Sequence, residues 1–134
     1  MCQLGLVVAE FYGELAAEME AQARENAARR DATVAETVRV PGVYDAPLAA
    51  DRLARREGID AVAVLGVVVS GDTDHDRVVA HAAARKLGDV GLTRDTPVTF
   101  GVQGPGMSGA EARERVEKGA RAVTAAVDMV EELP

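Results

Sequence analysis

Four short runs of apolar, β-branched residues alternate with four longer stretches in which apolar residues recur at steps of three and four. The short runs are typical of buried strands, and the longer stretches of helices that bury one face. Strands joined by helices run parallel, because a parallel pair needs a long crossover connection. The 134 residues hold no linker or repeat, so the pattern predicts a single domain, residues 1–134, of alternating strands and helices.

We predict strands at residues 4–10, 33–40, 61–69 and 97–102. The third run is apolar almost throughout, as expected of a central parallel strand covered by helices on both faces. Right-handed crossovers then give a three-layer α/β/α sandwich, in which we expect the strand order 2-1-3-4.

The helices carry their own start signals. Asp45 is placed to cap the second helix, and Ser108 begins a capping box at the last helix, in which Gly119 is expected to be a weak point. The apolar period of the third helix predicts that one set of its residues faces the core: Val78, Val79, Ala82, Ala83, Leu87 and Val90.

The charge balance limits the possible partners. Acidic residues outnumber basic ones by 22 to 15, and no basic stripe or aromatic stacking set favours nucleic acid. No apolar run suits a membrane span and no signal peptide is recognisable, so we expect a cytoplasmic protein that contacts no membrane. The single cysteine, Cys2, excludes an internal disulfide and a zinc cluster. The acidic, arginine-rich composition suggests a salt-adapted or GC-rich source.

Ligands of such sheets collect outside the carboxyl ends of the strands, near the switch point between strands 1 and 3. This rule nominates the loops at residues 11–12, 41–45, 70–75 and 103–107. Phe11 and Tyr12 are half of the four aromatic residues, and either one ring packs in the core or one stacks on a planar ligand. Tyr44 and Asp45 could also belong to the site, but taken in isolation the sequence favours turn chemistry for both.

The densest polar segment, residues 70–76, has three interpretations. It is a helix start, capped by Asp72 or Thr73; or a divalent-cation loop, although it matches no complete metal motif; or an anion site formed by backbone N–H groups at a helix N-terminus. In the last case His75 lies one turn into the helix that follows and can exchange protons near neutral pH.

A phosphate in this acidic loop would need an arginine from elsewhere. Arg115 is a candidate, although residues 111–118 are also typical of a solvated helix face. His81 follows His75 by six residues, which is about 240° round a helix, so we expect it to be structural or exposed.

Several motifs, in this order along nearly the whole chain, resemble those of the lumazine synthase family. The last two resemble its archaeal branch. The motifs are Val8–Phe11, Val40–Ala49, Leu65–His75, Pro97–Val102, Gly104–Met107 and Glu114–Val116.

The resemblance implies a flavodoxin-like fold and an enzyme of riboflavin biosynthesis. Its reaction condenses 5-amino-6-(D-ribitylamino)uracil with 3,4-dihydroxy-2-butanone 4-phosphate to 6,7-dimethyl-8-ribityllumazine, releasing phosphate and water. Positioning and one acid/base group suffice for such steps, so no cofactor and no metal are expected. The family forms homo-oligomers, either pentamers or shells of twelve pentamers with 60 subunits.

The resemblance also implies residue roles. Phe11 would stack on the pyrimidine, His75 would shuttle protons, and Phe100 and Arg115 would come from the adjacent subunit, with Arg115 neutralising the phosphate. The ribityl chain would contact Val43, Tyr44 and Asp45. The uracil edge would bind backbone groups of Val67, Val68 and Val69, and the phosphate would bind Gly71, Asp72 and Thr73.

Three departures from the family are visible. Tyr12 stands where many members have asparagine, and Asp45 is one methylene shorter than the usual glutamate. The last helix lacks a segment that brings a lysine to the site, for which Arg121 or Lys118 are the available substitutes. The alternatives are an archaeal riboflavin synthase, a non-catalytic flavodoxin-like binding domain, and a purely structural shell protein.

Overall fold

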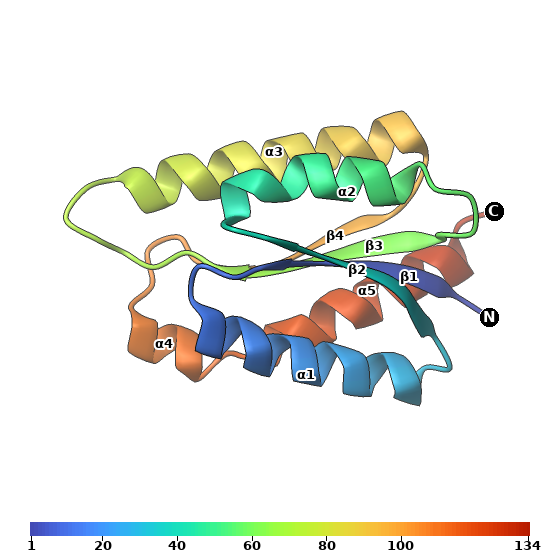
Figure 1. Ribbon diagram of the computed structural model, residues 1–134, viewed down its shortest axis with the longest axis horizontal. Coiled ribbons are helices and arrows are strands. Elements are labelled where there is room, and N and C mark those ends of the chain that lie inside the picture. Colours follow the sequence, from blue (N-terminus) through green and yellow to red (C-terminus); the bar gives the residue numbers. More distant parts are fainter.

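The computed structural model describes residues 1–134. Its elements alternate as predicted, with one short 3-10 helix before the second α-helix (Figure 1). In chain order they are β1 (Gln3–Ala9), α1 (Gly13–Arg29), β2 (Thr33–Val40), η1 (Val43–Asp45), α2 (Ala46–Ala54), β3 (Ala61–Val67), α3 (His75–Arg94), β4 (Val98–Gln103), α4 (Gly109–Arg113) and α5 (Lys118–Glu132).

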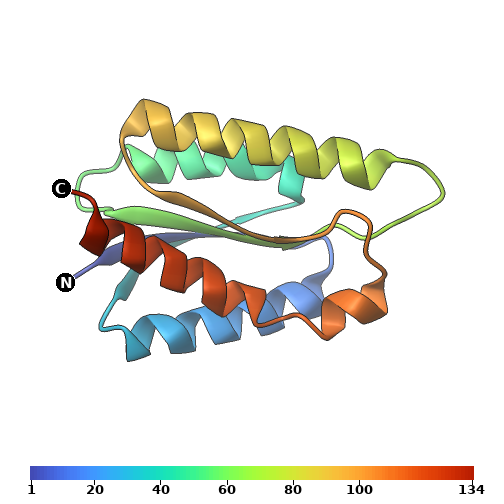
Figure 2. The same cartoon turned by 180° about the vertical axis from the view of Figure 1, so that it is seen from behind.

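The four strands form one parallel sheet in the order β2-β1-β3-β4, which confirms the prediction. Helices α2 and α3 cover one face of the sheet, and α1, α4 and α5 cover the other (Figures 1 and 2). Both chain termini lie at the end of the molecule opposite the loop that precedes α3 (Figure 1). The fold is therefore the three-layer, flavodoxin-like sandwich.

Strand alternation divides the core into two clusters. Leu6 and Val8 of β1 pack with α1 and α5, whereas Val7 and Ala9 pack with α2 and α3, because successive side chains of a strand point to opposite faces. Every residue of β3 is buried, as expected of its central place. None of the helices has both the length and the apolar surface needed to cross a membrane.

Two predictions about the helices are wrong. Val78 is 64% exposed, because the inward face of α3 runs through Asp76, Ala80, Ala83 and Leu87 and places Val78 on the opposite side. The predicted last helix is divided into α4 and α5 by a turn at residues 114–117, although the Ser108 capping box forms as expected.

Gly119 is a point of close helix contact and not a weak point. A Cβ built at Gly119 would lie 2.3 Å from the carbonyl oxygen of Met19 in α1. Only glycine allows the backbones of α1 and α5 to approach this closely.

Candidate active site

A cavity of about 460 Å³ opens at the carboxyl ends of β1, β2 and β3. This is the switch point predicted from the strand order, because β1 and β3 lie side by side while their following helices cover opposite faces. Three of the four nominated loops line it. The lining residues are Phe11, Tyr12, Gly42, Val43, Tyr44, Val67, Val68, Val69, Ser70, Gly71, Thr73, His75, Asp76 and Val79.

Most of the predicted site residues meet in this cavity. Asp45, Asp72, Phe100 and Arg115 do not line it. The prediction missed Tyr12, Gly42, Ser70, Asp76 and Val79 as lining residues; three of them stand in nominated loops, so their position was a usable signal.

Phe11 and Tyr12 form the rim after β1. Their rings are 4.9 Å apart in an edge-on arrangement. Tyr12 packs against the core on the α1 side, whereas Phe11 is 74% exposed. Tyr12 therefore supports Phe11, whose exposed ring offers a surface on which a planar heterocycle can stack.

The loop after β2 places Val43 and Tyr44 at the cavity, with Asp45 directly behind them in the chain. Val43 is buried, and Tyr44 is 68% exposed. Asp45 is the N-cap residue of α2, but its side chain caps no helix N–H; instead its Oδ2 accepts the N–H of Gly42 at 3.1 Å. The predicted N-cap position is therefore confirmed, but the side chain bonds Gly42 and not the helix, because the 3-10 turn brings Gly42 within reach. Asp45 Oδ1 makes no hydrogen bond within the chain.

The segment after β3 has free backbone donors. The strand ends at Val67, two residues earlier than predicted, although the N–H of Val68 and of Ser70 still donate to the carbonyls of Gln103 and Met107, each at 2.8 Å. The N–H groups of residues 71–74 then make no hydrogen bond within the chain. Such donors before a helix form a place where an anion binds.

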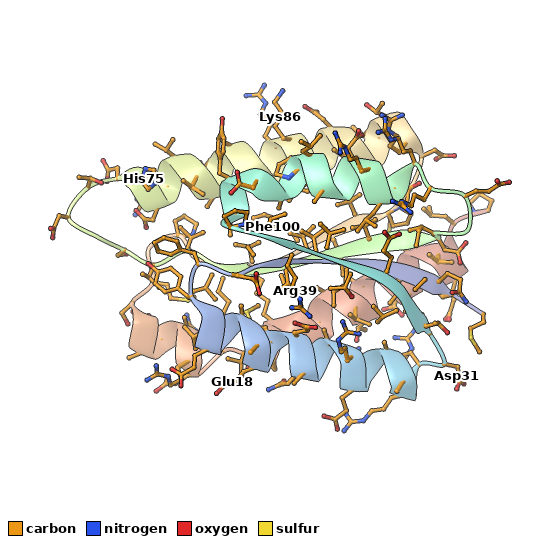
Figure 3. All side chains as sticks on the ribbon, viewed as in Figure 1. Glu18, Asp31, Arg39, His75, Lys86 and Phe100 are labelled. Carbon is orange, nitrogen blue, oxygen red and sulfur yellow. The ribbon has the colours of Figure 1, made fainter.

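Helix α3 begins at His75, whose N–H donates to Thr73 Oγ1 at 3.2 Å. Neither Asp72 nor Asp74 contributes a capping side chain. His75 is exposed at the start of α3 (Figure 3), so its imidazole is accessible from the cavity that it lines. His81 is exposed on the same helix.

Asp76 is the buried acid of the site. It is 7% exposed, and its Oδ2 accepts the N–H of Gly106 at 3.0 Å. That bond, aided by the N–H of Arg77, holds the pKa of the Asp76 carboxyl below its ordinary value, although burial acts in the opposite direction. Gly106 has a φ of 77°, which suits glycine.

The two residues expected from an adjacent subunit lie away from the cavity. Phe100 is half-buried against the core on the α2 and α3 side (Figure 3). Arg115 follows α4, its side chain is 56% exposed, and its nearest acid is Glu111 at 4.0 Å. No lysine or arginine is among the residues that line the cavity. No group of histidine, cysteine and acidic side chains is arranged to hold a metal ion.

Gln103 is a buried polar residue that the sequence did not single out. It ends β4, is 1% exposed, and donates from Nε2 to the carbonyl of Ala112 at 2.9 Å. It therefore fixes the end of α4, which is followed by the turn that contains Arg115. Its only signals in the sequence were a polar residue at the end of an apolar strand and its place at the start of the nominated loop at residues 103–107.

The fold and the cavity together define a class of protein. It is a flavodoxin-like α/β protein whose pocket, at the carboxyl edge of the sheet, combines an aromatic surface, free N–H donors and a histidine. Such a pocket suits a ligand with a planar ring and an anionic group.

Comparison with known proteins identifies the family. The sequence model of the 6,7-dimethyl-8-ribityllumazine synthase family matches residues 1–133. The chain is 68% identical to the 6,7-dimethyl-8-ribityllumazine synthase of Halobacterium salinarum over 99% of this chain and 100% of that protein. It is 62% identical to that of Halorubrum lacusprofundi, over 99% of each chain. The corresponding enzyme of Methanocaldococcus jannaschii is 48% identical, over 99% of this chain and 94% of its own.

The chain therefore belongs to the 6,7-dimethyl-8-ribityllumazine synthase family. The haloarchaeal relatives agree with the salt-adapted source that the acidic composition suggests.

Proposed function

We propose that this protein is a transferase of riboflavin biosynthesis that forms 6,7-dimethyl-8-ribityllumazine from 5-amino-6-(D-ribitylamino)uracil and 3,4-dihydroxy-2-butanone 4-phosphate. The observation that carries the proposal is the full-length family match. The cavity supports it, because Phe11 and Tyr12, residues with free N–H donors and His75 all line one pocket. An archaeal riboflavin synthase is not favoured by this match, and its reaction has no phosphate to bind.

The first substrate has a flat ring and a polyhydroxy chain. The exposed ring of Phe11 suits the pyrimidine, and backbone groups of Val67, Val68 and Val69 at the end of β3 suit its polar edge. Val43 and Tyr44 would flank the ribityl chain. The Oδ2 of Asp45 is bonded by Gly42, so its Oδ1 is available to accept from the hydroxyls of the ribityl chain.

The second substrate carries a phosphate. Its oxygens would accept from the free N–H groups of Gly71, Asp72 and Thr73. The amine of the first substrate adds to the ketone and one water leaves to give an imine. Phosphate is then eliminated, and the second amine closes the ring on the remaining carbonyl with loss of a second water. His75 would carry the protons between these steps, since it begins α3 directly after the residues with free N–H groups.

We further propose that the site is completed by an adjacent subunit of a homo-oligomer. A phosphate needs a countercharge, and no cation lines the cavity. Arg115 and Phe100 of a neighbouring chain would supply the charge and the closing ring. Phe11 and Tyr44, which line the cavity, are exposed in the single chain, as are Leu48 of α2 and Val78 of α3, as expected of an interface. A pentamer is the minimal assembly, a shell of 60 subunits is its extension, and the cytoplasm is the expected location.

One assay tests the reaction. The purified protein is mixed with both substrates, from low to molar salt, and the lumazine chromophore and free phosphate are followed together. We expect equal amounts of both products. Their absence at every salt concentration would refute the proposed reaction.

A variant tests the proton carrier. His75→Ala should lower turnover while the ribitylaminouracil still binds, because the imidazole moves protons and holds no part of the ring. His81→Ala, on the exposed face of the same helix, is the matched control and should leave turnover unchanged. A normal rate for His75→Ala would remove this residue from the mechanism.

A further inference from the structure

The phosphate loop, residues 70–75, is tied to another segment at both of its ends. At its start, the N–H of Ser70 donates to the carbonyl of Met107 at 2.8 Å. Immediately after it, Asp76 Oδ2 accepts the N–H of Gly106 at 3.0 Å. Two neighbouring residues of the β4–α4 connection therefore hold the two ends of one loop.

Between these two ties the loop has almost no bonds of its own. The N–H groups of residues 71–74 are unpaired, and Thr73 Oγ1 accepts only from His75. The directions of the free N–H groups are consequently set by where the ends are fixed. The tie at Ser70 uses backbone atoms alone, whereas the second tie depends on one side chain, that of Asp76.

Asp76 is well placed for this task. It lies in the first turn of α3, is nine-tenths buried and lines the cavity. The residues beside it are Arg77, whose guanidinium lies near Gly106, and His75. A Cβ at Gly104, two residues before Gly106, would lie 1.9 Å from the carbonyl oxygen of Val68. The β4–α4 connection is thus packed directly on the end of β3 and cannot move aside freely.

We infer that Asp76 is a positioning residue of the active site: by accepting the N–H of Gly106, it fixes the loop whose free N–H groups bind the substrate's phosphate. This inference rests on the proposed function. On this inference Asp76 acts through the loop and not through contact with a reacting atom. Its effect should therefore fall on the phosphate-bearing substrate and not on the pyrimidine.

The test compares three variants of the full-chain, assembled enzyme. Asp76→Ala removes the acceptor, whereas Asp76→Asn keeps an oxygen that can accept from Gly106 but removes the charge. Asp51→Ala is the matched control: Asp51 also anchors α3, through two hydrogen bonds from Arg94 at the far end of the helix.

For Asp76→Ala we expect the KM for the butanone phosphate to rise and kcat to fall, each by roughly tenfold, because small errors of position reduce rates by such factors. The KM for the ribitylaminouracil should stay the same. Asp76→Asn should recover most of the loss, and Asp51→Ala should lower the melting temperature with unchanged kinetic constants.

Direct binding of inorganic phosphate, measured by calorimetry, separates this inference from the proposed reaction. It should weaken in Asp76→Ala and recover in Asp76→Asn even in a protein that forms no lumazine. The inference is overturned if Asp76→Ala keeps normal phosphate affinity and KM. It is equally overturned if Asp76→Asn is as impaired as Asp76→Ala, or if Asp51→Ala shows the same selective loss.

Discussion

Mixed oligomers of His75→Ala and Arg115→Ala test whether one active site is built from two chains. His75 lines the cavity, whereas Arg115 lies outside it with an exposed side chain. In a ring, each shared site takes His75 from one chain and Arg115 from the next. A site that joins the intact His75 of one variant to the intact Arg115 of the other is then complete, although neither variant alone has a complete site.

Two magnitudes are expected: the loss of rate in each single variant, and the fraction of complete sites in the mixture. Loss of Arg115 removes hydrogen bonds to a charged group, worth about 1.5–3 kcal/mol, or roughly 13- to 160-fold in rate. With equal amounts of both variants mixed at random, about one quarter of shared sites should be complete. A site contained within one chain would never be complete in this mixture.

The assay is lumazine formation after the two variants are unfolded together and reassembled. A second mixture, wild type with the double variant His75→Ala/Arg115→Ala, provides the control. Shared sites again give about one quarter of full activity, whereas sites within one chain give about one half. Activity no higher than that of the separate variants in the first mixture, with one half in the second, would refute a shared site.

Two further predictions concern stability. Gly119→Ala should destabilise the protein by about 1–3 kcal/mol, because the new Cβ meets the Met19 carbonyl. Gly88→Ala, in open space on α3, should instead stabilise it by about 1 kcal/mol; thermal unfolding shifts of the same sign would contradict the close-contact argument. Hydrogen bonds from Arg39 and from Arg94 lower the pKa of Glu20 and of Asp51, respectively, below their ordinary values of 4.5 and 3.8. The stabilisation of the fold by these two ionised carboxyl groups is complete at pH values above their ordinary pKa. It is lost as the pH falls through the lowered pKa. Denaturant midpoints should therefore drop in acid, less steeply in Asp51→Asn, and an identical acid profile in that variant would contradict the role of the Arg94 bond.

The sequence predicted the layers and strand order because these depend on periodicity and crossover rules, which are local or general. The predictions failed where a contact between segments that are distant in the chain determines the position or the effect of a residue. The outward position of Val78 follows from the inward turn of Asp76 toward Gly106, thirty residues along the chain. Gly119 was expected to weaken a helix by its propensity, but the approach of Met19 reverses that expectation.

The location of the site was predictable for a similar reason. Parallel strands bring their carboxyl ends to one edge, so the loops containing Phe11, Val43 and His75 had to meet. The chain alone did not reveal that Asp45 bonds Gly42 and not the helix, nor that Gln103 holds α4. Both depend on the exact path of a short connection, for which residue type is a weak guide.

The acidic character of the phosphate loop is itself an argument for a shared site. The carboxylate of Asp76 is occupied by Gly106, but Asp72 and Asp74 are exposed close to the free N–H groups. Arg77, the arginine of the same chain next to this loop, does not line the cavity, so within one chain the phosphate position has no countercharge to offset these aspartates. An arginine fixed on the framework of a neighbouring chain can be aimed at the phosphate position without relaxing onto them. On this interpretation, assembly of the subunits is the step that gives the loop its selectivity for an anion.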